Sequence, residues 1–155
     1  MDDSHVQMLQ TWASAFRTAI EVTRAQRIAG ALPYFPEGAC RLTSRLFAQY
    51  LALRSHAAGF GRAQLVSGIL PGSEHAARHY WLEVDDVVID LAADPFGEAP
   101  VVVGSRTAFH QSLESTIAED AAASLATLSA DEAARLARQL ATIESRLSWL
   151  PTPAA

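Results

Sequence analysis

The chain has a single cysteine, Cys40, and two further residues with matching chemistry near its middle, His79 and Asp90. A thiolate, an imidazole and a carboxylate together can perform nucleophilic catalysis at a carbonyl carbon. The thiolate attacks, the imidazole moves the proton, and the carboxylate holds the imidazole in one tautomer. Whether this chemistry is available depends on the elements that carry the three side chains.

Cys40 lies in FPEGACRLTSRLFAQYL, residues 35–51, where a loop with proline and glycine leads into a helical pattern. The pattern places Cys40 in the first turn of a helix, where unpaired backbone N–H groups and the helix dipole stabilise a thiolate. Gly38 and Ala39 leave the approach to the sulfur open, and the Cys40 N–H is a candidate oxyanion donor. A lone cysteine is also a common apolar core residue, so this segment leaves both interpretations open.

The segment HYWLEVDDVVIDL, residues 79–91, is typical of a β-hairpin with a tight Asp-Asp turn. This register predicts an apolar face made of three cross-strand pairs: Val84 with Val87, Leu82 with Ile89, and Tyr80 with Leu91. On the opposite face His79 and Asp90 become diagonal neighbours, about 7–8 Å apart at the backbone and within reach of a hydrogen bond. A longer turn would move Asp90 into the core, where an unpaired carboxylate costs several kcal/mol.

Other side chains near this hairpin have alternative roles. Asp94, in AADPF, is a second candidate for orienting His79. Trp81 shares the predicted face of His79 and is either a wall of a cleft or a half-buried packing residue. Glu83 is expected to be solvated. Gln64, on the first predicted strand, would supply an oxyanion donor only if the fold brings it close.

The order of GAC at a helix start, HYWLEVDD on a strand and IDLAADPF on the next strand resembles the transglutaminase-like branch of the papain-like cysteine hydrolases. The resemblance covers residues 35–110 and implies Cys40 as nucleophile, His79 as general base and then acid, and Asp90 as the orienting carboxylate. Lasso-peptide leader peptidases, with a similar thiol helix and an H-x-W-x-E-V strand, are one possibility within this superfamily. Tyr80 departs from the small residue common after this histidine, and no glutamine precedes Cys40 as a papain-like oxyanion donor.

The wider pattern predicts one α+β domain over residues 1–155, with a papain-like or transglutaminase-like core of one cysteine-bearing helix on a small antiparallel sheet. Residues 1–34 are expected to form an amphipathic helix, capped by Ser4, and a loop. Four short apolar runs then predict strands: AQLVSGIL, HYWLEV, VVIDL and PVVVG. Helical character returns at Ser112, so we expect residues 111–150 to form C-terminal helices.

The last helix begins with a capping box, Ser129 and Glu132. Its apolar positions alternate in steps of four and three residues: Leu136, Leu140, Ile143, Leu147 and Leu150. This spacing favours packing on the protein's own core, and it also fits a helix that binds a protein partner or a second copy. The final PTPAA is expected to fray.

The composition excludes several classes of protein. Of the 155 residues 50 % are hydrophobic and 19 % charged, as in a globular domain, and the net charge of −5 with scattered arginines argues against nucleic acid. The chain has no lysine for catalysis, and its single cysteine excludes an internal disulfide and a cysteine-rich zinc site. Without a span of about 20 apolar residues or a secretory signal, we expect a cytoplasmic protein with no membrane partner.

We expect no cofactor and no metal. His75 and His79 have the spacing of a helical metal pair, but EHAARH lacks the glutamate that follows the first histidine in zinc proteases. The remaining histidines are expected at the surface or in local hydrogen bonds: His5, His56 and His110.

These observations lead to three hypotheses about function. The first is a cysteine peptidase, amidase or acyl transferase that acts on a peptide or protein through Cys40, His79 and Asp90 by way of a thioester. The second is a catalytically silent papain-like fold that binds a peptide or protein. The third is an α+β domain in which the three residues coincide by chance.

Overall fold

The computed structural model describes residues 2–28 and 32–147, apart from the side chains of residues 55–58. Its helices are α1 (Asp3–Ala25), α2 (Cys40–Ala58), α3 (Ala108–Ser112), α4 (Ala121–Ala126) and α5 (Ala130–Leu147), with a 3-10 turn, η1, at Asp94–Phe96. Its strands are β1 (Ala63–Ile69), β2 (Arg78–Val84), β3 (Val87–Asp90), β4 (Val102–Gly104) and β5 (Glu114–Asp120). This is an α+β protein, as predicted.

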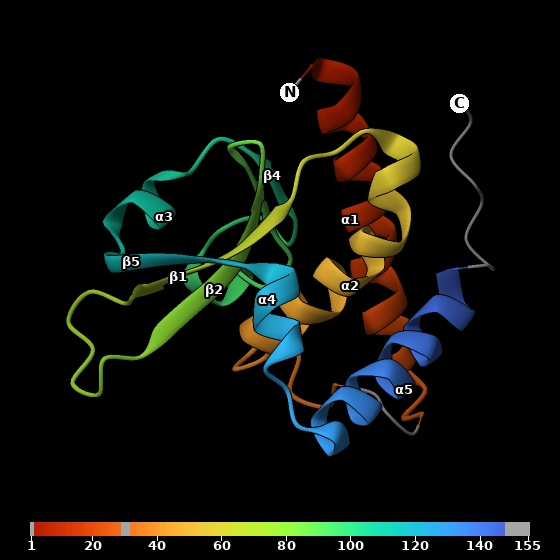
Figure 1. The fold of residues 1–155 in the computed structure, drawn as a ribbon. Helices are drawn as coiled ribbons and strands as arrows, with labels where there is room; N and C mark the ends of the chain where they lie inside the picture. Colours follow the sequence, from red (N-terminus) through yellow and green to blue (C-terminus); the bar gives the residue numbers. More distant parts are fainter. Residues whose placement is uncertain (1, 29–31, 148–155) are drawn as a thin grey trace.

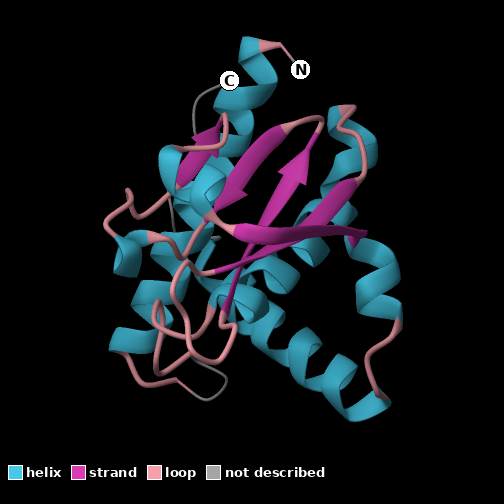
Figure 2. Cartoon of the chain, turned by 90° about the vertical axis from the view of Figure 1, so that its left-hand side faces the viewer, coloured by secondary structure: helices cyan, strands magenta, loops and turns pink. Residues whose placement is uncertain are grey.

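The five strands form one sheet in the order β4-β3-β2-β1-β5, and every neighbouring pair is antiparallel. Helices α1, α2, α4 and α5 lie on one side of the sheet and the short helix α3 lies on the other (Figures 1 and 2). The main core fills the space between the sheet and the larger helical layer. A smaller cluster lies under α3 and contains Val66, Trp81, Val88 and Leu113.

The β2–β3 hairpin has the predicted register. Val84 pairs with Val87 and Leu82 with Ile89, so the turn consists of two residues. Asp85 and Asp86 have φ of 48° and 66°, the left-handed conformations that a two-residue type I′ turn requires. The two-residue turn keeps the alternation of faces, so that His79 and Trp81 lie on the α3 side of β2.

Two expectations about the ends of the chain were wrong. Helix α1 is capped by Asp2, whose carboxylate accepts the His5 N–H at 2.9 Å, and not by Ser4. Residues 114–120 form strand β5 instead of helix, paired with the edge of β1. Most side chains of β5 are exposed, so the strand has no buried face, and the alternation that marks a half-buried strand is missing from its sequence.

Helix α5 packs on the protein's own core. The capping box is present, since the Ser129 N–H donates to Glu132 Oε2 at 2.9 Å and the Glu132 N–H donates to Ser129 Oγ at 3.2 Å. Leu136, Leu140 and Ile143 are buried in the main core. Leu150 and the PTPAA segment lie outside the described residues. Among the described helices, none is long and apolar enough to cross a bilayer.

Candidate active site

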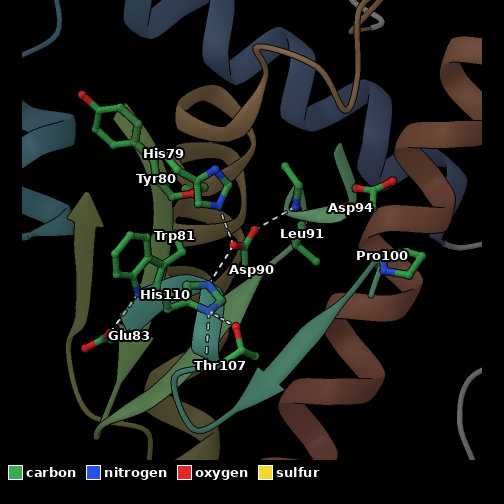
Figure 3. Close-up of polar contacts among 12 residues, drawn as sticks. His79, Tyr80, Trp81, Glu83, Asp90, Leu91, Asp94, Pro100, Thr107 and His110 are labelled. Atoms are coloured by element: carbon green, nitrogen blue, oxygen red, sulfur yellow. Dashed lines mark hydrogen bonds and ion pairs between the residues drawn. The ribbon is translucent and has the colours of Figure 1, made fainter. Parts of the chain in front are cut away.

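His79 and Asp90 form a buried pair at the end of the hairpin. Nε2 of His79 on β2 lies 2.6 Å from Oδ2 of Asp90, the last residue of β3. The two side chains are 0 % and 1 % exposed. The diagonal arrangement predicted from the register therefore produces the expected hydrogen bond (Figure 3).

The Asp90 carboxylate has three N–H donors. Oδ1 accepts the Ala92 N–H at 2.9 Å, and Oδ2 accepts a second bond, from His110 Nε2 at 3.0 Å, beside that from His79. Burial by itself raises the pKa of Asp90, but the hydrogen bonds from His110 and His79 outweigh burial and hold this pKa below its ordinary value of 3.8. Asp90 is therefore a buried anion, and each of its two carboxylate oxygens accepts at least one hydrogen bond.

His110 is the site residue that sequence reasoning missed. It was expected at the surface or in a local hydrogen bond, but it is 1 % exposed and contacts Asp90, twenty residues earlier in the chain. The local bond is also present, since His110 Nδ1 accepts from Thr107 Oγ1 at 2.9 Å and from the Thr107 N–H at 3.4 Å. The only sequence signal is the i,i+3 spacing of Thr107 and His110 at a helix start, which resembles a capping box.

The Cys40 thiol lies near the His79 ring, whose second nitrogen is Nδ1. Nδ1 is buried and makes no hydrogen bond of standard geometry within the described residues, but the Cys40 thiol is close enough to act on the charge of the ring. Burial lowers the pKa of His79, yet the hydrogen bond and negative charge of Asp90, together with Cys40, raise it to about 9. The imidazolium form is therefore favoured at neutral pH.

Cys40 occupies the predicted position at the start of α2. It is half-buried, packs against the main core on one side, and is accessible on the other. Ala39 precedes the helix and has no side chain that can cap it, so the first-turn N–H groups are available to stabilise negative charge. Ser44, one turn later, donates to the Tyr80 carbonyl at 3.3 Å and ties this end of α2 to β2 beside His79.

Aromatic rings surround the imidazole of His79. Trp81 stacks with the ring at 6.1 Å between centroids, and the edge-to-face neighbours Phe96 and Phe109 lie at 5.2 and 5.3 Å. Trp81 is fully buried, so of the two alternatives for this residue the half-buried one was wrong. Glu83 is not simply solvated either, because it accepts the Trp81 indole N–H at 2.8 Å and pairs with Arg106 at 2.7 Å.

The reserve candidates do not contact His79. Both oxygens of Asp94 bind the Arg17 guanidinium, at 2.7 and 2.9 Å. Gln64 pairs with Glu83 across β1 and β2, whereas His79 pairs with Gly68, four residues further along β1. His75 is exposed and lies in the connection before β2, which is not helical.

Two imidazoles and a carboxylate in one place are also a possible metal-ligand set. The ligating atoms of His79, Asp90 and His110 lie within 4.8 Å of one another. Tetrahedral zinc with bonds of 2.0–2.1 Å separates its ligand atoms by about 3.3 Å. The 2.6 and 3.0 Å contacts to Oδ2 are shorter than this separation, and hydrogen bonds account for them. The arrangement favours a proton-sharing network over a metal centre.

Comparison with known proteins finds no match to this chain among family models, curated proteins or solved structures. The class of protein is thus defined by its fold and site alone: an α+β domain in which a helix-borne thiol and a carboxylate act on the same buried imidazole.

Proposed function

We propose that the protein is a thiol-dependent hydrolase or acyl transferase that acts on an amide bond of a peptide or protein. The observation that carries the proposal is the environment of the His79 ring, which bonds Asp90 through Nε2 and whose pKa is also raised by the nearby Cys40 thiol. The order of the three residues on α2, β2 and β3, and their resemblance to the transglutaminase-like branch of papain-like hydrolases, support this assignment.

In the proposed reaction the Cys40 thiolate attacks the carbonyl carbon of the substrate. The oxyanion that forms is stabilised by first-turn N–H groups of α2, including that of Cys40. Because Asp90 uses Nε2 of His79, Nδ1 is the ring atom that exchanges a proton with the substrate. Nδ1 gives its proton to the leaving amine, and the C–N bond breaks to leave a thioester on Cys40.

In the second half-reaction the thioester is broken, and the proton moves to His79 instead of away from it. Water, or an acceptor amine in an acyl transfer, attacks the thioester carbon while His79 Nδ1 takes the proton. The C–S bond breaks, the product leaves, and the thiolate and imidazolium pair is restored. Asp90 stabilises the imidazolium form in both half-reactions through its 2.6 Å bond.

The test uses the only thiol in the chain. The rate of alkylation of Cys40 by iodoacetamide is measured against pH in the native protein and in His79→Gln, which keeps a polar side chain at a buried position. We expect rapid alkylation below pH 7 in the native protein. In the variant we expect a rate that is at most about one tenth of the native rate. His75→Gln is the matched control, because His75 is exposed and lies in the β1–β2 connection.

A native thiol that reacts only near pH about 8.5, where a free cysteine ionises, would contradict the proposal. Such a result, in a protein folded as judged by circular dichroism, would favour a peptide-binding domain without catalytic activity. A fall in rate with His75→Gln equal to that with His79→Gln would also contradict it, since the effect would not depend on the buried imidazole.

A further inference from the structure

The proposed reaction uses one histidine, but Asp90 binds two. Nε2 of His110 lies 3.0 Å from the same oxygen, Oδ2, that Nε2 of His79 approaches at 2.6 Å. Figure 3 shows the two rings on opposite sides of the carboxylate, one from β2 and one from α3. His110 is buried and is held by Thr107 at the start of α3. A buried imidazole with three polar contacts is more than a space-filling side chain.

The contacts on both sides of the His110 ring determine its tautomer. A charged carboxylate can only accept hydrogen bonds, so Nε2 of His110 donates to Asp90. A backbone N–H can only donate, so Nδ1 of His110 accepts from Thr107, and the Thr107 hydroxyl at 2.9 Å donates to the same atom. The contacts with Asp90 and with Thr107 are independent of each other, and both place the ring proton of His110 on Nε2.

The bonds of Asp90 also restrict its rotation. The Ala92 N–H holds Oδ1 at 2.9 Å, and His110 holds Oδ2 from the side opposite to His79. Without His110, Oδ2 would keep only His79 as a partner, and the carboxylate would be held by two hydrogen bonds in place of three. Two donors on one oxygen also share its negative charge, so each bond stabilises its own imidazole less than it would alone.

We propose that His110 is a positioning residue, which supplies the third hydrogen bond to the Asp90 carboxylate and, by sharing Oδ2, lowers the basicity of His79. This inference rests on the proposed function, because it gives His110 a role in the proton transfer between His79 and Cys40. The charged or titratable groups that face His79 are Cys40 from α2, Asp90 from β3 and His110 from α3. Glu83, below Trp81, is neutralised by Arg106.

The first test is the tautomer itself. Imidazole carbon and nitrogen chemical shifts of His110, assigned by comparison with a His110→Gln sample, report which nitrogen carries the proton at pH 7. We expect the proton on Nε2. Thr107→Val removes the hydroxyl donor, and in this variant we expect a mixture of the two tautomers. Thr107→Ser keeps the hydroxyl, and there we expect the native signal. A native ring protonated on Nδ1 alone would overturn the inference.

The second test is the titration of His79 by the same signals. His110→Leu removes the competing donor, and we expect the pKa of His79 to rise by about one unit. His110→Gln places an amide N–H near the position of Nε2, so we expect it to restore most of the native pKa. A pKa unchanged in His110→Leu, or an equal shift in both variants, would overturn the inference, because a space-filling role predicts these results. Should His110→Leu not fold, the same titration of His79 is made in Thr107→Val, where we expect the pKa of His79 to change, and in Thr107→Ser, where we expect the native value.

The two proposals fail separately. The titrations need no substrate and no reactive thiol, so they report on His110 even if Cys40 proves unreactive. In that case the proposed thiol-dependent reaction is wrong, but the effect of His110 on the pKa of His79 can still be measured. Conversely, a rapidly alkylated Cys40 whose pH profile is the same in His110→Leu and in the native protein leaves the proposed function intact and overturns the role of His110.

Discussion

Arg17 of α1 and Asp94 of η1, which are 77 residues apart, form a bidentate ion pair at 2.7 and 2.9 Å. The same guanidinium donates to the Leu91 carbonyl at 2.9 Å and to the Pro100 carbonyl at 2.8 Å. Arg17 thus binds both ends of the segment that follows Asp90. Asp94, the second candidate for orienting His79, therefore anchors the chain next to the site and does not orient His79.

Replacing Arg17 by methionine should lower the free energy of unfolding by about 3 kcal/mol, because the variant leaves a partly buried carboxylate and two carbonyls without their partner. Urea denaturation followed by circular dichroism measures this change. Arg24→Met is the matched control, since Arg24 lies exposed on the same helix and should change stability by less than about 0.5 kcal/mol. Equal effects of the two substitutions would show that the buried contacts of Arg17 do not stabilise the fold.

The stability conferred by His79 should depend on pH in a defined direction. The pKa of His79 is raised in the folded protein from 6.5 to about 9, so its contribution is complete below pH 6.5 and is lost as pH rises to 9. Asp90, whose pKa is lowered, contributes above pH 3.8 and loses its contribution as the solution becomes more acidic. The stability advantage of the native protein over His79→Gln should therefore fall by about 3 kcal/mol between pH 6.5 and pH 9.

Chemical denaturation of both proteins at several pH values measures this difference. Asp90→Asn provides the control, because without the carboxylate the main cause of the raised pKa is gone and the dependence should be much weaker. An advantage of the native protein that stays constant, or grows, toward pH 9 would contradict the assignment of a charged imidazole at neutral pH.

The turn of the hairpin should accept glycine at its second position. Asp86 has φ of 66°, which is unfavourable for a residue with a side chain, whereas glycine adopts it freely. We expect Asp86→Gly to raise the free energy of unfolding by about 1 kcal/mol and Asp86→Val to lower it, because branching at Cβ conflicts with this backbone. Thermal denaturation of the two variants checks the prediction. Opposite signs would mean that the turn differs from the two-residue type I′ form.

Leu140 distinguishes a core helix from a docking helix. Its side chain is 4 % exposed, so Leu140→Ala should cost about 2–5 kcal/mol of stability. Leu53→Ala on α2, where the side chain is 69 % exposed, should have almost no effect and is the matched control. If Leu140→Ala left stability unchanged but altered the oligomeric state in sedimentation experiments, α5 would be an interface helix.

The parts of the site that could be predicted from the sequence are those governed by short-range rules. Cys40 starts α2 because proline and glycine end the preceding loop and an apolar helical spacing follows. His79 and Asp90 meet because the alternation of faces and a two-residue turn define the hairpin register over only eleven residues. The α+β class follows in the same way from the order of periodic segments.

Only the tertiary structure decided which other residues join the site. His110 has no periodic relation to Asp90, and a short helix on the far side of the sheet brings it to the carboxylate. Asp94 was the second candidate for orienting His79, but Arg17, distant in sequence, binds its carboxylate. Strand β5 forms because the open edge of β1 pairs with it, although its own residues carry no buried pattern. Such contacts depend on how layers pack, and local sequence preferences do not specify that packing.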